Sequence, residues 1–445
     1  MKSLQFSLVC SLLFFISVVS AQKIHTTGAI AGESVKSMNG GDLTPTGLDI
    51  DTLESSVPMM HVGGGIHTTA DFTYIKGKLA ANEEPWVSGW KKLISNHHAQ
   101  ETYLPNPTEK LVRGGNTIWE QDTDNYGKAM NDVAAAYQLA LRWRISGEEK
   151  YAQASIKILN AWSSTCKSIN GDSNMSLAAG IYGYQFAIAG ELMRDYPGWT
   201  KDEFKAYHQW MIDVFYVSNL DFLVRRHGTC AEHYWANWDL CNLASVLAIG
   251  ILADRRDIYN VAIAYLQEGV GNGNLNKTIN FVHIVDGEKI GQLQESGRDQ
   301  GHSTMVIALL SVIGELTYNQ GDDFYGYKDN LILRGSEYTA KYNVALQDVP
   351  FENYTYIPCN GINPKPENEW WYQTEVSSHS RGVERPMWCA IYNHYAKVKK
   401  ISENETKYTK MGVNYSGVEG GGGDYGQNSG GFDQLGFGTL MYTLD

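Results

Sequence analysis

Apolar residues recur at helical spacing along most of the chain. Met130, Val133, Ala134, Tyr137 and Leu141 fall on one face of the segment 126–145, which predicts an amphipathic helix. Seven further segments show the same spacing, and short Gly, Asp or Asn turns join them two by two. The predicted helix pairs are 126–145 with 148–163, 177–194 with 201–216, 237–253 with 255–268, and 298–319 with 329–343.

Repeated helix hairpins in one large chain are typical of an open solenoid or of a closed ring. The sequence has no fixed repeat period, which argues against a solenoid. Long inserted loops at 271–297 and 347–385 favour an all-α toroid with a cleft. We expect residues 22–60 to form an irregular arm, and residues 61–445 to form a single domain whose loop-rich C-terminal tail packs back onto it.

The first 21 residues have the features of an export signal. Lys2 precedes an apolar core at 8–19, and small residues end at Ala21. The apolar core is too short to span a bilayer, and no later segment reaches the roughly 18 apolar residues required. The sequence therefore predicts a secreted protein without a membrane partner. Five N-x-S/T sequons predict a glycoprotein; they begin at Asn174, Asn276, Asn353, Asn404 and Asn414.

The composition and net charge of the chain limit the kinds of molecule that it can bind. The 445 residues are 43% hydrophobic and 19% charged, which excludes a disordered chain. The net charge is −13, and it becomes −14 when Lys2 leaves with the signal. An acidic protein is a poor nucleic-acid binder. It can bind an acidic polymer only if a cleft gathers cationic donors locally. We expect a monomer.

Cysteine usage limits the cross-links and metal sites. Cys10 leaves with the signal, and the remaining five cysteines permit at most two disulfides and leave one thiol free, unless chains pair. No Cys/His spacing resembles a zinc site. We therefore predict neither a metal nor another cofactor. The five cysteines are Cys166, Cys230, Cys241, Cys359 and Cys389.

Two segments combine residue types that could carry chemistry. His233 and Asn237 lie four positions apart at the start of one apolar helix, and Arg298 and His302 do so at the start of another, just after Glu295. A helix N-terminus favours an anion. The two segments therefore predict two helix ends that converge on a substrate carboxylate.

Each segment also has a plainer interpretation. Aromatic-rich segments are more often core than sugar platforms, an Arg-Asp-Gln run often only caps a helix, and a single histidine is more often structural. The density of His, Asn, Arg and Glu beside aromatic residues at both helix starts favours a ligand site.

These residue types suit β-elimination of a polyuronate. The C5 proton of a uronate becomes acidic when Asn, His or Arg donors neutralise the adjacent carboxylate, after which a His or Tyr base removes it. Inverting glycoside hydrolysis needs two carboxylates instead, and Glu295, Asp299 and Asp239 could supply them. A non-catalytic sugar-binding protein is the third hypothesis.

Several long motifs resemble one enzyme family. They are LAAGIYGYQFAIAGELMRDYPGW at 177–199, HYWANWDLCN at 233–242, GQLQESGRDQGH at 291–302, EYTAKYN at 337–343 and GGGGDYGQNSGGFDQLGFGTL at 420–440. Together they resemble the alginate-lyase-like proteins of polysaccharide lyase family 38. The resemblance implies an incomplete (α/α) toroid of about six to seven hairpins, and lyase activity on poly-mannuronate alginate or on glucuronan.

The resemblance also implies catalytic roles. Such lyases use an Asn/His neutralising pair before a Tyr-Trp, then an Arg, and a catalytic Tyr six or seven residues later. His233 and Arg298 match, and Asn237 is the nearest Asn, although it follows the Tyr-Trp. Thr304 and Met305 stand where the Tyr is expected.

The missing tyrosine leaves the catalytic base open. We assign the base to His302, and candidate replacements are Tyr234, Tyr338 and Tyr342. The predicted substrate-binding residues are Asn174, Gln185, Tyr234, Trp235, Glu295, Gln300, Tyr338, Tyr342 and Arg381. Arg298, His233, His302 and Arg381 are predicted to form a locally positive groove.

Overall fold

The computed structural model describes residues 57–357, 359 and 371–445. The predicted signal peptide and most of the predicted arm lie outside these residues. Residues 57–60 have no regular secondary structure. Arg256 donates to the carbonyl oxygens of Val57 and Pro58, and Gln320 bonds both the N–H and the carbonyl of Met60, so this end of the arm is fixed to the helical body.

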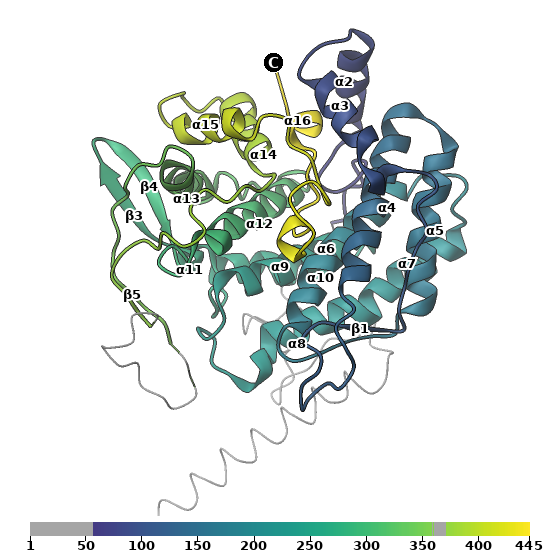
Figure 1. Cartoon of the computed structure of the whole chain (residues 1–445), viewed down its shortest axis with the longest axis horizontal. Coiled ribbons are helices and arrows are strands. Elements are labelled where there is room, and N and C mark those ends of the chain that lie inside the picture. Colours follow the sequence, from purple (N-terminus) through teal and green to yellow (C-terminus); the bar gives the residue numbers. More distant parts are fainter. Residues whose placement is uncertain (1–56, 358, 360–370) are drawn as a thin grey trace, which may run out of the picture.

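Six helix pairs form the framework of the described chain (Figure 1). They are α2 (Thr69–Ala80) with α3 (Trp86–Ser95), α4 (Gly127–Ser146) with α5 (Glu149–Thr165), α6 (Met175–Met193) with α7 (Lys201–Trp210), α9 (Ala236–Leu252) with α10 (Arg256–Glu268), α12 (Gln300–Tyr318) with α13 (Tyr327–Asn343), and α14 (Trp388–Asn393) with α15 (Lys407–Ser416). The shorter helical elements are η2 (His97–Ala99), η3 (Met211–Tyr216), α8 (Val217–Arg225), η4 (Arg226–Gly228), α11 (Leu275–Thr278), η5 (His394–Val398), η6 (Ser429–Gly431) and α16 (Gly438–Met441).

The first helices of successive pairs form the inner layer. α6 packs against α4 and α9, and α9 packs against α12. Glycines on α6 allow this close approach, because a Cβ at Gly180 would lie 2.8 Å from the backbone nitrogen of Asn242 and one at Gly183 would lie 2.2 Å from Ser245 Oγ. α6 and α9 are buried along nearly their whole length, so their sequences are apolar on all faces rather than on one stripe.

The predicted helix boundaries agree with the structure to within one or two residues in most pairs. α4 ends at Ser146, and Gly147 takes the left-handed conformation (φ 76°) that often closes a helix. The predicted helix at 201–216 instead continues as a π-helical turn, η3, into α8. α13 corresponds to the predicted helix at 329–343. Its residues Lys328, Asp329 and Asn330 have positive φ, so regular helical geometry begins after them.

The segment 271–297, predicted as a long inserted loop, contains regular structure. It contains α11 and an antiparallel hairpin of β3 (Ile279–Val285) and β4 (Glu288–Leu293). The turn is Asp286-Gly287, with φ values of 50° and 84°, which is the geometry that two-residue hairpins prefer. The Asp-Gly pair between apolar runs was the available signal.

Two smaller sheets and the C-terminal tail complete the fold. β1 (Lys110–Val112) pairs in parallel with β2 (Ser168–Asn170), and β5 (Tyr354–Thr355) pairs with β6 (Tyr372–Gln373). The tail runs between α12 and α4 (Figure 1), where Gln185 on α6 donates to the carbonyl of Phe432 at 2.8 Å. The tail therefore packs back onto the helices, as predicted.

One disulfide joins Cys230 to Cys359, and Cys166, Cys241 and Cys389 are buried thiols. This pattern agrees with the predicted upper limit of two disulfides. In the part of the chain that the structure describes, no helix is both long and apolar enough to cross a bilayer.

Candidate functional site

The loop before α12 and the start of α9 meet around the carboxylate of Glu295. The Asn237 side chain donates to both oxygens, at 2.8 and 3.0 Å, and Arg298 Nη1 lies 3.0 Å from Oε2. Glu295 is fully buried and Asn237 is 1% exposed. The amide of Asn237 therefore holds Glu295, and Glu295 in turn fixes the guanidinium of Arg298.

The protein's own side chains occupy the two helix N-termini. The first N–H groups of α9, at Ala236 and Asn237, donate to Gln294 Oε1 (3.0 Å) and Glu295 Oε1 (2.8 Å). Asp299 caps α12 by accepting from the His302 N–H at 2.8 Å. The prediction that these helix ends converge on a substrate carboxylate is therefore wrong, because both positive ends are already neutralised.

The two predicted i, i+4 pairs are also not formed on helices. His233 lies in a turn before α9, and Arg298 lies in a turn before α12. His302 is on α12, where its Nδ1 lies 2.6 Å from Asp299 Oδ2. Burial tends to raise the pKa of Asp299, but the hydrogen bond and charge of His302 outweigh it, and the pKa lies below its usual value.

The Asp299–His302 pair has the geometry of an oriented base. The carboxylate fixes the Nδ1 side of the imidazole, which makes Nε2 the position for proton transfer. The side chain of His302 is 38% exposed, whereas that of Asp299 is 14% exposed. A polymer can therefore reach the imidazole more readily than the carboxylate behind it.

An aromatic stack lies against the same arginine. The Arg298 guanidinium lies 4.9 Å from the centroid of the Trp235 ring, and the Tyr356 ring stacks on Trp235 at 4.9 Å with an interplanar angle of 16°. The Tyr356 hydroxyl is 3.3 Å from His233 Nδ1. The structure thus brings together His233, Trp235 and Arg298 from the predicted set, and adds Tyr356.

The tyrosines predicted as alternative bases are poorly placed for that role. Tyr338 is 1% exposed and donates to the carbonyl of Pro350, and Tyr342 is 4% exposed with Arg381 stacked on it at 3.8 Å. Burial raises the pKa of Tyr338, Tyr342 and Tyr234 alike. Thr304 and Met305 also point into the core, at 0% and 5% exposure.

Four other predicted binding residues use their side chains for hydrogen bonds within the protein. Asn174 ends the turn before α6 and donates to Asp172 Oδ1, and the 1% exposed Gln185 fixes the tail. Gln300 donates to the carbonyls of Ser296 and Ser377, and Arg381 donates to those of Tyr342 and Gln347. Gln300 thereby fixes the loop at Ser377 close to His302, and all four residues use donors that were predicted to face substrate.

The charge around the cluster is mixed rather than simply positive. Arg298 is paired with Glu295, and Arg385 from the loop before α14 lies 3.1 Å from Asp433 Oδ2 in the tail. Burial raises the pKa of Asp433, while the charges of Arg385, Arg113 and His302 act to lower it. Arg113, Arg385 and His302 therefore share one electrostatic environment, and sequence analysis missed the first two.

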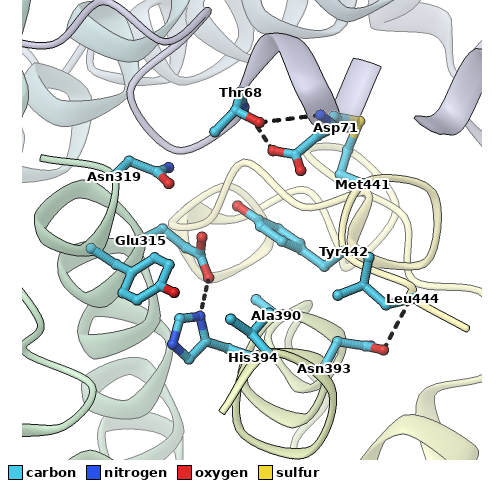
Figure 2. A pocket seen from close by; sticks show the side chains of 12 residues that line it. Thr68, Asp71, Glu315, Asn319, Ala390, Asn393, His394, Met441, Tyr442 and Leu444 are labelled. Carbon is cyan, nitrogen blue, oxygen red and sulfur yellow. Dashed lines mark hydrogen bonds and ion pairs between the residues drawn. The ribbon is translucent and has the colours of Figure 1, made fainter. Parts of the chain in front are cut away.

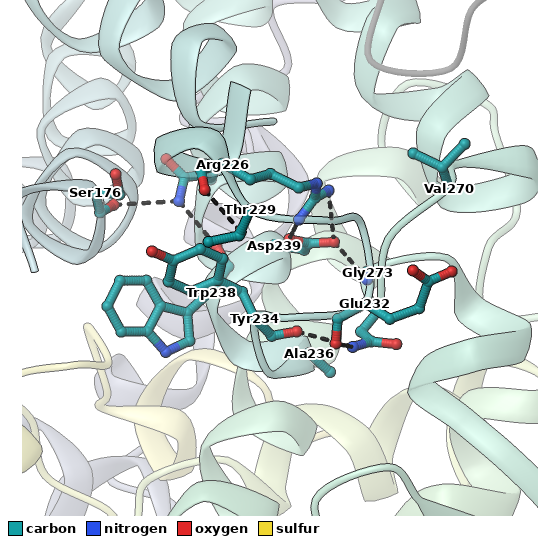
Figure 3. Close-up of polar contacts among 12 residues, drawn as sticks. Ser176, Arg226, Thr229, Glu232, Tyr234, Ala236, Trp238, Asp239, Val270 and Gly273 are labelled. Carbon is teal, nitrogen blue, oxygen red and sulfur yellow. Dashed lines mark hydrogen bonds and ion pairs between the residues drawn. The ribbon is translucent and has the colours of Figure 1, made fainter. Parts of the chain in front are cut away.

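A buried ion pair, Arg226 with Asp239, lies beside the start of α9 (Figure 3). Arg226 donates to both carboxylate oxygens of Asp239, at 2.8 and 3.2 Å, and the Gly273 N–H donates to the same group at 2.8 Å. Asn272 donates to the carbonyl of Tyr234 at 2.8 Å. Asp239 is therefore a structural carboxylate that fixes the segment leading into α9.

A polar pocket lies away from this cluster. Its volume is about 190 Å³, and Glu315, His394, Asp71 and Tyr442 line it (Figure 2). Glu315 and His302 are thirteen residues apart on α12, or about 20 Å along the helix. No arginine or lysine lines this pocket, so the cluster around Arg298 is the better candidate for an anionic polymer.

Among residues 57–357, 359 and 371–445, no three His, Cys, Asp or Glu side chains gather in a way that could hold a metal ion. The residue that sequence analysis missed at the cluster itself is Tyr356. A usable signal was present, because Tyr354 and Tyr356 alternate along an extended segment that ends at Cys359, and alternate residues of a strand share a face.

Comparison with known proteins identifies the chain's relatives. The family model described as alginate lyase matches residues 87–349, which is more than half of the chain. A search of curated proteins finds no match.

Two solved structures resemble the fold. An alginate lyase from Bacteroides ovatus superposes with a TM-score of 0.57 at 14% identity, covering 86% of this chain and 100% of that one. A variant of alginate lyase A1-III from Sphingomonas species A1, complexed with a tetrasaccharide, gives 0.54 at 13% identity, covering 86% and 97%. With the helix pairs described above, they confirm the predicted (α/α) toroid.

Proposed function

Because the chain belongs to the alginate lyase family, we propose that it cleaves a 1,4-linked polyuronate by β-elimination and leaves unsaturated uronate ends. The chain is a polysaccharide lyase, and poly-mannuronate alginate and glucuronan are the substrates we propose. The observation that carries this proposal is a fixed guanidinium, Arg298, beside an oriented imidazole, His302.

Arg298 is suited to neutralise the substrate carboxylate. Glu295 holds its Nη1, Trp235 covers its plane, and Asp299 lies 3.6 Å from its Nε. Nη2 has no partner among the described residues, so it can donate to a uronate carboxylate. A held guanidinium needs little reorganisation when negative charge develops at C5 and the carboxylate during proton abstraction.

His302 is suited to move the proton. In the proposed reaction its Nε2 takes the C5 proton, the C4–O4 bond breaks, and a double bond forms between C4 and C5. The imidazolium then returns the proton to O4 of the leaving sugar. Asp299 stabilises the imidazolium, as an adjacent carboxylate does in other His-dependent sites.

The same contacts disfavour an inverting hydrolase. Such an enzyme needs one carboxylate to protonate the leaving group and another to activate water. Glu295 is buried against Asn237 and Arg298, Asp239 is buried against Arg226, and Asp299 caps a helix and holds His302. Each candidate carboxylate already has an internal role.

We further propose that the protein is secreted and glycosylated. Four of its five sequon asparagines are exposed, namely Asn276, Asn353, Asn404 and Asn414, whereas Asn174 is half-buried. A shift in mass after peptide:N-glycosidase treatment of protein made in a eukaryotic secretory host would support this. An unchanged mass would contradict it.

The decisive experiment is incubation with poly-mannuronate, poly-guluronate and glucuronan, followed by ultraviolet absorbance and mass spectrometry. A lyase gives an unsaturated, absorbing product from at least one polymer, and His302→Ala should abolish it while the exposed control His97→Ala should not. New reducing ends without absorbance would indicate a hydrolase. Binding without cleavage of any polymer would indicate a sugar-binding protein.

A further inference from the structure

The segment that carries Tyr354 and Tyr356 is fastened to the site wall at several points. Tyr354 Oη accepts from Gln294 Nε2 at 2.7 Å, and Gln294 Oε1 accepts from the first N–H of α9. Tyr356 N donates to the carbonyl of Trp371, which continues the pairing of β5 with β6. The segment is thus held both by the site and by its own small sheet.

The disulfide adds a covalent link at the same place. Cys230 precedes His233 by three residues, and Cys359 follows Tyr356 by three residues. The bond therefore joins the two chain segments that face each other through the Tyr356–His233 and Tyr356–Trp235 contacts. These segments are 129 residues apart in sequence, so no local structure would keep them in register.

Tyr356 contacts two side chains of the candidate site, Trp235 and His233. Its side chain is 6% exposed, and its ring stacks on the ring of Trp235. The guanidinium of Arg298 also lies against the Trp235 ring. Its hydroxyl reaches His233 Nδ1. Burial raises the pKa of Tyr356, although Arg298 acts against this, so the phenol keeps its proton at neutral pH and can donate it.

We infer that Tyr356, clamped by the Cys230–Cys359 bond, is a positioning residue that fixes both the tautomer of His233 and the plane of Trp235 behind Arg298. When the hydroxyl donates to Nδ1, the ring proton of His233 resides on Nε2, where it can donate to a uronate carboxylate. This inference rests on the proposed lyase function for its kinetic consequences, but the tautomer can be measured without any substrate.

Tyr356→Phe keeps the ring and removes the hydroxyl. We expect kcat on the cleaved polyuronate to fall about tenfold, the effect of one oriented hydrogen bond, with KM nearly unchanged. The ¹⁵N signals of the His233 ring, assigned by loss in His233→Gln, should shift from one dominant tautomer to a mixture. Tyr415→Phe, at a 49% exposed tyrosine on α15, is the matched control and should change neither quantity.

Cys230→Ser combined with Cys359→Ser removes only the covalent clamp. We expect the same tautomer mixture and a similar loss of kcat, with little change in the far-ultraviolet circular dichroism. A wild-type tautomer and wild-type kcat in Tyr356→Phe would overturn the inference. If the wild-type protein cleaves no polyuronate, the proposed function fails, but the ¹⁵N comparison still decides whether Tyr356 positions His233.

Discussion

Glu315 makes a strong prediction about how stability depends on pH. Its carboxyl is buried near the end of α12, where Tyr325 donates to Oε1 at 2.9 Å and His394 Nδ1 lies 3.7 Å away (Figure 2). Burial raises the pKa of Glu315 to about 8, and the negative charge of Asp71 adds to the effect. Burial lowers the pKa of His394 to about 3, so the imidazole supplies no compensating charge at neutral pH.

The magnitude follows from proton linkage. A glutamate has a pKa of about 4.5 in the unfolded chain and about 8 here, so the folded state holds the proton more tightly. Stability is therefore greatest below the unfolded value and falls as pH rises from about 4.5 to about 8. Between pH 5 and pH 8, the free energy of unfolding should lose about 3 kcal/mol from this one group.

Glu315→Gln removes the titration and keeps an oxygen that can accept from Tyr325. Between pH 5 and pH 8, the free energy of unfolding of this variant should fall by about 3 kcal/mol less than that of the wild type. At pH 8 it should equal or exceed the wild-type value. The assay is urea unfolding at pH 5, 6, 7 and 8. Glu337 and Glu419 also have raised pKa values, about 7 each, but they contribute equally to both proteins.

Glu403→Gln is the matched control, because the side chain of Glu403 is 80% exposed, and it should leave the pH dependence unchanged. Parallel curves for wild-type and Glu315→Gln protein would refute the reasoning, since they would mean that the buried carboxyl titrates alike in both states. Polyuronate cleavage should be unaffected, because the group lies about 20 Å along α12 from His302.

Arg298, Arg226 and Glu419 each give one further prediction. Arg298→Ala should lower kcat/KM for the cleaved polyuronate by an amount equivalent to about 3 kcal/mol of transition-state stabilisation, as loss of a transition-state donor does. Arg298→Lys should recover part of this loss. Arg226→Ala leaves the buried carboxylate of Asp239 without its cation and should cost about 3–5 kcal/mol in urea unfolding. Glu419→Ala removes the acceptor of two N–H groups at the start of α14 and should cost about 1–2 kcal/mol.

Each of these three predictions would be contradicted by a specific result. Wild-type turnover in Arg298→Ala would remove that residue from the site. For the buried pair, an apolar double variant, Arg226→Met with Asp239→Leu, should regain much of the lost stability, and if it does not, the loss comes from packing rather than from an unpaired charge. Unchanged stability in Glu419→Ala would mean that water satisfies the two N–H groups.

The helices were predictable because their signal is local. α5 and α10 each bury one face, so their apolar spacing gives their bounds closely, and Gly147 marks the end of α4. The hairpin of β3 and β4 was missed because only its Asp286-Gly287 turn was distinctive. The π-helical turn η3 carries no composition signal, since it arises from how the helix fits its neighbours.

The location of the candidate site was predictable from the sequence, but the hydrogen-bond partners of its side chains were not. His233, Asn237, Arg298 and His302 do gather at the starts of α9 and α12. The sequence suggested that those helix ends and Asn237 would face substrate. In the structure Asn237 instead donates to Glu295, because a buried carboxylate needs hydrogen-bond donors and Asn237 lies within reach.

By itself, the sequence determined an all-α chain of paired helices with a cluster of His, Asn, Arg and Glu at two helix starts, because hydrophobic period and residue type are properties of neighbouring positions. Only the tertiary structure decided which side chains bond to one another. Asn237 meets Glu295 across 58 residues, and His233 meets Tyr356 across 123. Such contacts depend on how helices pack and loops cross, and no local pattern encodes that geometry.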